Sequence, residues 1–220
     1  RRHALRTLRL TGVRELTTTL WAKQNQHDGD RWRLFTAVGD AIGAERVLYP
    51  GSFVDVAASF VFPSVTYVDA DRRASRFFGD VDGVNEIIAA HRPHPWTPTV
   101  AFLHADYTGP LGMPDEGFDL LISLYAGFVS EHCTRYLRLG GTLLVNPSHG
   151  DAAMASIDNR YRLRDVVRHR NGQYSVGGDD LHAHLVPKKP TEVTVELLHR
   201  TQRGIGYTTS PFAYLFERTS

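Results

Sequence analysis

The sequence predicts an α/β fold with a Rossmann-like, doubly wound and mainly parallel sheet, antiparallel strands at its C-terminal edge and helices at the N-terminus. Up to about residue 150, short apolar and β-branched runs alternate with segments of helical period, which is typical of βαβ units. Beyond that point, strand-like runs follow one another with little helix between them. The length of 220 residues suits one hydrophobic core and is short for two.

We therefore expect a single domain over residues 1–220, with an N-terminal helical extension (1–45), a core (46–150) and a strand-rich part (151–220). The hydrophobic content of 42% and charged content of 22% are ordinary for a globular protein. A net charge of +1 argues against binding to nucleic acid or acidic membranes through overall charge.

The single cysteine, Cys133, excludes an intrachain disulfide and indicates a reducing compartment. No apolar run is long enough to cross a bilayer. The chain starts without Met and without the apolar core of a signal peptide, so we expect it to begin inside a longer, cytoplasmic protein.

Helical spacing of apolar residues predicts a basic first helix, with Leu5, Leu8, Val13, Leu16 and Leu20 as its apolar positions, and a second helix from Asp30 as N-cap to Gly43 as C-cap. Further helices are predicted over 71–78, 84–90 and 127–137, and a tight turn over 138–141. The predicted strands are 46–49, 65–69, 99–103, 118–124, 142–145, 161–167, 192–198 and 212–216.

Candidate binding residues follow the strands, because open parallel sheets bind ligands beyond the carboxyl ends of their strands. Asp69 is the most informative of them. It ends a strand and lies about 20 positions past the first turn, where an acid can hydrogen-bond the ribose hydroxyls of a nucleoside. The alternative is that Asp69 caps the next helix, although Asp71 could do that instead.

Several stretches, taken in order, resemble the class I S-adenosylmethionine-dependent methyltransferases over about residues 30–150. They are Val47-Leu48-Tyr49-Pro50-Gly51-Ser52, Tyr67-Val68-Asp69, Ala105-Asp106, Phe118-Asp119-Leu120-Leu121 and Tyr136-Leu137-Arg138-Leu139-Gly140-Gly141-Thr142-Leu143-Leu144-Val145. The last looks much like the fourth helix and fifth strand of that family. The Pro-Gly-Ser turn is similar to that of a bacterial subgroup of such proteins.

The resemblance implies S-adenosylmethionine as cofactor, no metal, and a small-molecule or unidentified methyl acceptor. Gly51 to Asp55 would wrap the methionine part, Asp69 would hold the ribose, and Asp106 would face the adenine amino group. Ser123 to Tyr125 would line the floor where methyl transfer takes place. The full set of implied cofactor-binding residues is Tyr49, Pro50, Gly51, Ser52, Asp55, Asp69, Ala70, Asp71, Asp106, Tyr107, Ser123, Leu124 and Tyr125.

The first loop departs from the family pattern, which reads acid-x-Gly-x-Gly-x-Gly so that the backbone can approach the cofactor. Tyr49 stands at the acid position, and Phe53 and Asp55 replace two glycines. Asp55 could take over the lost acid's contact, or Phe53 and Asp55 could fill the pocket and leave a non-catalytic binding module. A lesser alternative, an NAD-dependent oxidoreductase, is disfavoured by the missing Gly-x-Gly-x-x-Gly.

Three other features each have a functional and an ordinary interpretation. His149 or Asp151 could act as a general base, but their segment is also a simple turn. His182 and His184 could bind a metal, although no second ligand cluster accompanies them. The arginines of 160–170 could contact phosphate, for instance of RNA, together with basic residues of the first helix, or could form a solvated face, which we favour. A nucleic-acid acceptor is not favoured, because no Asn/Asp-Pro-Pro-aromatic motif follows the fourth strand.

Overall fold

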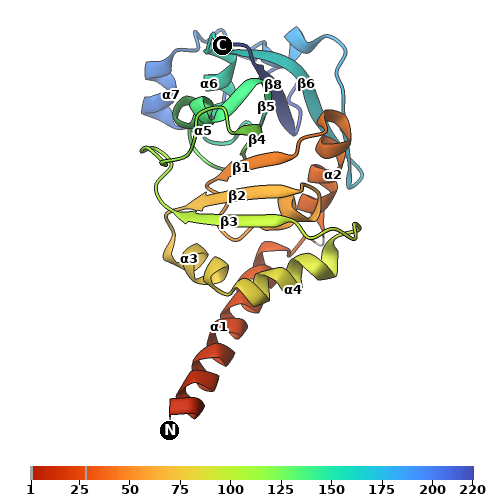
Figure 1. The fold of residues 1–220 in the computed structure, drawn as a ribbon. Helices are drawn as coiled ribbons and strands as arrows, with labels where there is room; N and C mark the ends of the chain where they lie inside the picture. Colours follow the sequence, from red (N-terminus) through yellow and green to blue (C-terminus); the bar gives the residue numbers. More distant parts are fainter. Residues whose placement is uncertain (1, 28) are drawn as a thin grey trace.

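The computed structural model describes residues 2–27 and 29–220, with side chains from residue 12 onward. Eight strands form one sheet (Figure 1). They are β1 (Arg46–Pro50), β2 (Ser64–Asp69), β3 (Thr99–His104), β4 (Phe118–Ser123), β5 (Leu137–Val145), β6 (Tyr161–Arg170), β7 (Gln173–Val176) and β8 (Ala213–Arg218).

Seven α-helices and four short 3-10 helices surround the sheet in the described part of the chain. The α-helices are α1 (Arg2–Gln24), α2 (Asp30–Ile42), α3 (Arg72–Gly79), α4 (Val81–His91), α5 (Val129–Cys133), α6 (Asp151–Ile157) and α7 (Val195–Thr201). The 3-10 helices are η1 (Ala57–Phe60), η2 (Thr134–Tyr136), η3 (Ser148–Gly150) and η4 (Leu181–Leu185).

The strand order is β3-β2-β1-β4-β5-β8-β6-β7. Strands β1 to β5 pair in parallel, whereas β8 is antiparallel to both β5 and β6, and β7 is antiparallel to β6. The order reverses between β1 and β4, which is the switch point of a doubly wound sheet. The predicted fold class, including the antiparallel C-terminal edge, is confirmed.

Alternating side chains of the parallel strands supply two separate cores. Val47 and Tyr49 of β1 pack on one face with apolar residues of α2, α3 and α4, in what we call the first core. Leu48, between them in sequence, packs on the other face with residues of α5, α6 and α7, the second core. Both faces of the sheet are therefore covered, as a parallel sheet requires.

Two of the helix caps predicted from the sequence are present in the structure. Gly43 adopts a left-handed conformation (φ 62°) and ends α2. Asp71 caps α3 by accepting a hydrogen bond from the Arg73 amide, so that role does not fall to Asp69. The predicted N-cap of α2 was wrong by one residue, because Gly29 is the cap and Asp30 is already helical.

Three other predictions were wrong. Residues 192–198 are not a strand, since Thr194 caps the helix α7 there. Residues 138–141 are not a tight turn but a bulged part of β5, which advances from Leu137 to Thr142 while β4 advances only from Phe118 to Leu120. The helix predicted over 127–137 is confined to α5 and η2.

The first helix is confirmed as α1, but the side chains of Leu5 and Leu8 lie outside the described residues.

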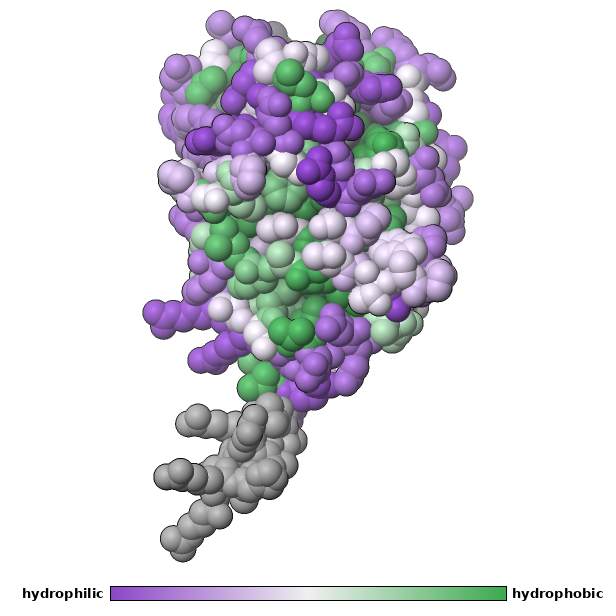
Figure 2. Space-filling view, viewed as in Figure 1, coloured by the Kyte–Doolittle hydropathy of each residue, from purple (hydrophilic) through white to green (hydrophobic). Residues whose placement is uncertain are grey.

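On the face shown in Figure 2, hydrophobic residues gather across the middle of the molecule, between more hydrophilic regions. Within residues 2–27 and 29–220, no helix has both the length and the apolar character needed to cross a membrane.

Candidate functional site

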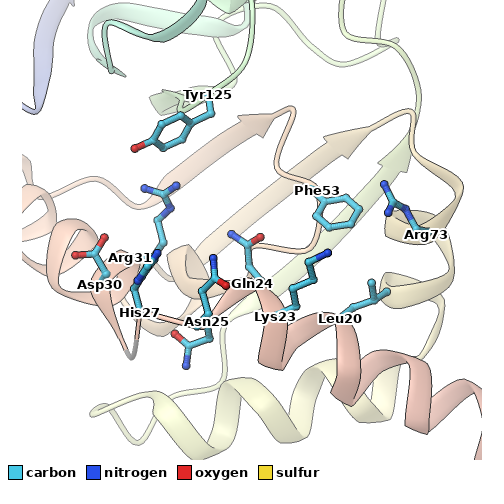
Figure 3. A pocket seen from close by; sticks show the side chains of 11 residues that line it. Leu20, Lys23, Gln24, Asn25, His27, Asp30, Arg31, Phe53, Arg73 and Tyr125 are labelled. Atoms are coloured by element: carbon cyan, nitrogen blue, oxygen red, sulfur yellow. The ribbon is translucent and has the colours of Figure 1, made fainter.

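A cavity of about 570 Å³ lies beyond the carboxyl ends of the parallel strands, beside the switch point. Its walls come from the segments that follow three strands, with Phe53 after β1, Arg73 in the helix after β2, and Tyr125 after β4. The end of α1 and the start of α2 complete it (Figure 3), through Leu20, Lys23, Gln24, Asn25, Gln26, His27, Asp30 and Arg31. Its position and size are those expected of a small-molecule site.

Two aromatic residues with unusual backbone conformations stand in this cavity. Phe53 (φ 48°) and Tyr125 (φ 57°) are both left-handed, which is rare for bulky side chains and typical of functional sites. Each lies beneath a guanidinium, with Arg73 Cζ 4.9 Å from the Phe53 ring centre and Arg31 Cζ 5.0 Å from that of Tyr125. Figure 3 shows Arg31 pointing toward Tyr125. The cavity thus combines flat apolar surfaces with positive charge.

Asp55, in the loop after β1, is 1% exposed and is not among the residues that line the cavity. Its Oδ2 accepts hydrogen bonds from the Tyr49 hydroxyl (3.0 Å) and from Arg31 Nε (3.1 Å), and its Oδ1 accepts one from the Ala57 amide (3.2 Å). Burial raises the pKa of Asp55, while the charge of Arg31 and these hydrogen bonds act to lower it. The carboxylate therefore anchors Arg31, one of the residues that line the cavity.

Asp69 is half-buried and connects the loop after β1 to the end of β2. Its Oδ2 accepts a hydrogen bond from the Phe53 amide and its Oδ1 one from the Asp71 amide, each at 2.7 Å. These bonds hold Phe53 in its left-handed conformation. Each carboxylate oxygen retains a second lone pair, so Asp69 can still accept hydrogen bonds from a ligand.

The loops after β1, β3 and β4 pack directly against one another. Gly51 (φ 65°) is so close to Ala126 that an added Cβ would lie 2.8 Å from the Ala126 Cβ. Tyr107 bridges to the same loop, since its hydroxyl donates to the Gly127 carbonyl (2.8 Å) and accepts from the Gly127 amide (3.1 Å). No ligand can enter between Gly51 and Ala126 without a loop movement.

The other candidate residues lie apart from the cavity. Pro50, Ser52, Ser123 and Leu124 are buried, and Ala70 and Asp106 are exposed. The Asp106 carboxylate is turned to the amide (2.9 Å) and hydroxyl (2.8 Å) of Thr108, which lower its pKa. Of the residues implied by the resemblance, Phe53, within the range Gly51 to Asp55, and Tyr125 are among the described residues that line the cavity.

Asp151 and His149, the candidate bases, also differ in accessibility. Asp151 is fully buried and accepts hydrogen bonds from Ser123 Oγ (2.5 Å) and Ser130 Oγ (2.5 Å), and burial raises its pKa. His149 is exposed and its Nδ1 lies 2.6 Å from Ser148 Oγ. His184 is buried, and with His182 it belongs to η4 rather than to a strand.

Sequence reasoning missed the part of the site contributed by α1 and α2. Lys23, Arg31 and Arg73 bring three positive side chains to the cavity, and Asp30 brings a negative one. The available signal was the run of polar residues 24–30 between the two predicted N-terminal helices. Nothing in the local pattern indicated that this segment folds over the strand ends.

Comparisons with known proteins were made at the level of sequence and of structure. No family model matches the chain, and no curated protein does. Among solved structures, an O-methyltransferase of Bacillus cereus in complex with S-adenosylhomocysteine is 12% identical to this chain, with a TM-score of 0.49. The match covers 75% of this chain and 88% of that one. A Klebsiella pneumoniae protein described as a putative O-methyltransferase is 14% identical (TM-score 0.46), with coverages of 76% and 86%.

An arsenic(III) S-adenosylmethionine methyltransferase of Chlamydomonas reinhardtii is 20% identical (TM-score 0.39) over 46% of this chain, which spans only 38% of that protein's length. At these identities and TM-scores the likeness adds nothing to what the strand order shows. The fold class therefore rests on the sheet topology described above.

Proposed function

We propose that the protein binds S-adenosylmethionine in the switch-point cavity and transfers its methyl group to a small-molecule acceptor. The single observation that supports this function is the cavity itself, which lies where a doubly wound sheet binds nucleosides and offers aromatic, cationic and anionic groups together. The groups in the cavity fit the cofactor. The interior of the loop after β1 does not, because Tyr49 and Asp55 already bind each other and Arg31.

In this proposal Lys23 and Arg31 bind the carboxylate of the methionine part, and Asp30 binds its ammonium group. Phe53 provides a flat surface for adenine, and Asp69 accepts hydrogen bonds from the ribose. When bound, the cofactor supplies an electrophilic methyl group on a sulfonium. The protein's own contribution is to orient the two reactants and exclude water from between them, since an in-line displacement depends mainly on positioning.

The direct test is calorimetric titration with S-adenosylmethionine and with S-adenosylhomocysteine. We expect micromolar binding, weakened about tenfold by Lys23→Gln through loss of a charge-assisted contact. Lys189→Gln, an exposed lysine that does not line the cavity, is the matched control and should leave the affinity unchanged. No binding at millimolar ligand would refute the proposal, and equal effects of the two variants would exclude the cavity as the site.

The second candidate function is a non-catalytic binding module. The observation that favours it is the closed loop after β1, where Gly51 packs on Ala126 and Asp55 is satisfied internally. The two functions differ in one measurement, which is mass-spectrometric detection of S-adenosylhomocysteine after incubation of the purified protein with S-adenosylmethionine and a pool of small hydroxyl, amine and thiol acceptors. Product above the level of an acceptor-free blank would eliminate the binding module.

A further inference from the structure

The arginines of β6 fall into two groups that differ in their partners. Arg162 Nη2 lies 2.9 Å from Glu217 Oε2, and Arg164 Nη1 lies 3.5 Å from the same oxygen. Arg168 and Arg170, at the far end of the strand, form no ion pair or hydrogen bond through their side chains with any described residue. The positive charge of the first group is therefore partly compensated by one carboxylate, whereas that of the second group has no such partner.

Arg168 and Arg170 line a groove of about 690 Å³ between the β6–β7 hairpin and the segment that precedes β8. Two histidines, His169 and His184, also line the groove, as do three hydroxyl residues, Ser175, Thr209 and Ser210. Among the described residues that line this groove there is no Asp or Glu. The groove thus offers two guanidinium groups and several hydroxyl and imidazole groups, with no acid to repel an anion.

The topology explains why this end of β6 is open. β8 pairs with β6 only as far as Val167, which faces Ala213, and the chain leaves the sheet at Phe212. Residues 168–170 consequently extend past the end of β8 and pair only with β7, in a hairpin whose tight turn is Asn171-Gly172, both left-handed.

The walls of the groove are held by specific contacts. The His169 ring stacks on Tyr174 at 4.4 Å and meets Phe212 edge-on at 6.0 Å. The Tyr174 hydroxyl donates to the Asp30 carboxylate at 2.9 Å, which ties the hairpin to the start of α2. His184 is 5% exposed, and its Nδ1 lies 3.3 Å from the Thr209 carbonyl oxygen. The aromatic and imidazole walls of the groove are therefore held in place before a ligand binds.

We propose that this groove binds the phosphate group of a small-molecule ligand. Guanidinium groups and hydroxyls are the usual protein partners of phosphate, and the planar fork of arginine suits its oxygens. A nucleic-acid backbone carries the same group, but the basic surface here is one short groove on a protein of net charge +1, and the neighbouring Arg162 and Arg164 already contact the Glu217 carboxylate. This site is separate from the switch-point cavity, and its test does not depend on the function proposed for that cavity.

The test is an NMR titration with inorganic phosphate at constant ionic strength, with chloride as the reference salt. We expect shifts of the His169 and His184 ring resonances and of the hairpin amides. The Arg168→Gln/Arg170→Gln double variant should weaken phosphate binding about tenfold or more, since it removes both charge-assisted contacts. The matched control is Arg162→Gln/Arg164→Gln, on the same strand and equally exposed, which should change the affinity less than about twofold.

Three outcomes would overturn the proposal. One is the absence of shifts at tens of millimolar phosphate, and another is an equal loss in the two double variants, which would indicate a response to overall charge. The third comes from a parallel titration with a short single-stranded RNA, where RNA binding without phosphate binding would assign the groove to nucleic acid. All four arginines are exposed, so these variants should fold, and a melting curve of each checks this.

Discussion

Two carboxyl groups are buried in the protein, one near each core, and they differ in the groups that surround them. Asp55 is 1% exposed and is matched by a cation, Arg31, with help from the Tyr49 hydroxyl. Asp151 is 0% exposed and is surrounded by the hydroxyls of Ser123 and Ser130 and the Ser130 amide, with no cation within ion-pair distance among the described residues. Burial raises the pKa of both groups.

The difference between them has a functional consequence. Because Asp55 holds Arg31, the loop after β1 and the start of α2 form one unit beside the candidate cofactor cavity. Asp151 holds α6 against α5, in the second core and away from that cavity. The carboxyl paired with a cation thus organises a site, whereas the carboxyl paired with hydroxyls organises packing.

The largest expected effect is that of Arg31→Met. The substitution leaves Asp55 buried without its cation, and breaking a buried pair in this way costs about 3–5 kcal/mol. Urea unfolding measures the loss, and adding Asp55→Asn should recover much of it. The control is Arg138→Met, which breaks an exposed pair with Asp119 and should cost under about 1 kcal/mol. Equal costs for the two single variants would contradict the assigned role of the pair.

A smaller effect is expected from Gly51→Ala, which tests whether the loop after β1 is as closely packed as the Asp55 contacts suggest. Gly43→Ala is a matched control, because Gly43 has a similar φ (62° against 65°) but no atom near the added Cβ. The control should lose about 1–2 kcal/mol from the left-handed backbone alone. Gly51→Ala should lose about 1–3 kcal/mol more from the contact with Ala126. Similar losses in thermal unfolding would show that the loop can move.

The smallest expected effect is on the pH dependence of stability in Asp151→Asn. A carboxyl with a raised pKa binds its proton more tightly in the folded than in the unfolded state, so the free energy of unfolding falls as pH rises above the ordinary value of 3.8. The slope reaches at most about 1.4 kcal/mol per pH unit for one proton. Asp151→Asn should remove this decline, which urea unfolding between acidic and neutral pH would detect. An unchanged slope would mean that Asp151 titrates normally.

The sequence predicted the features that depend on neighbours in the chain. Alternation of strands and helices, the Gly43 end of α2 and the Asp71 cap are all local, and each is present. The prediction of a strand over 192–198 failed because four apolar residues, Val193, Val195, Leu197 and Leu198, outweighed the capping signal of Thr194. The tight turn predicted at 138–141 failed because the glycines form a bulge inside a paired strand.

By itself, therefore, the sequence determined the fold class and the strand ends beyond which the candidate cavity lies, since the alternation of strands and helices follows from short-range patterns. The tertiary structure alone decided which residues form that site. Arg31 reaches Asp55 across 24 positions and Tyr174 reaches Asp30 across 144, and only folding brings such pairs together. Burial also depends on all the surrounding elements, and it places Asp55 in the interior, while Phe53, Tyr125, the end of α1 and the start of α2 line the cavity.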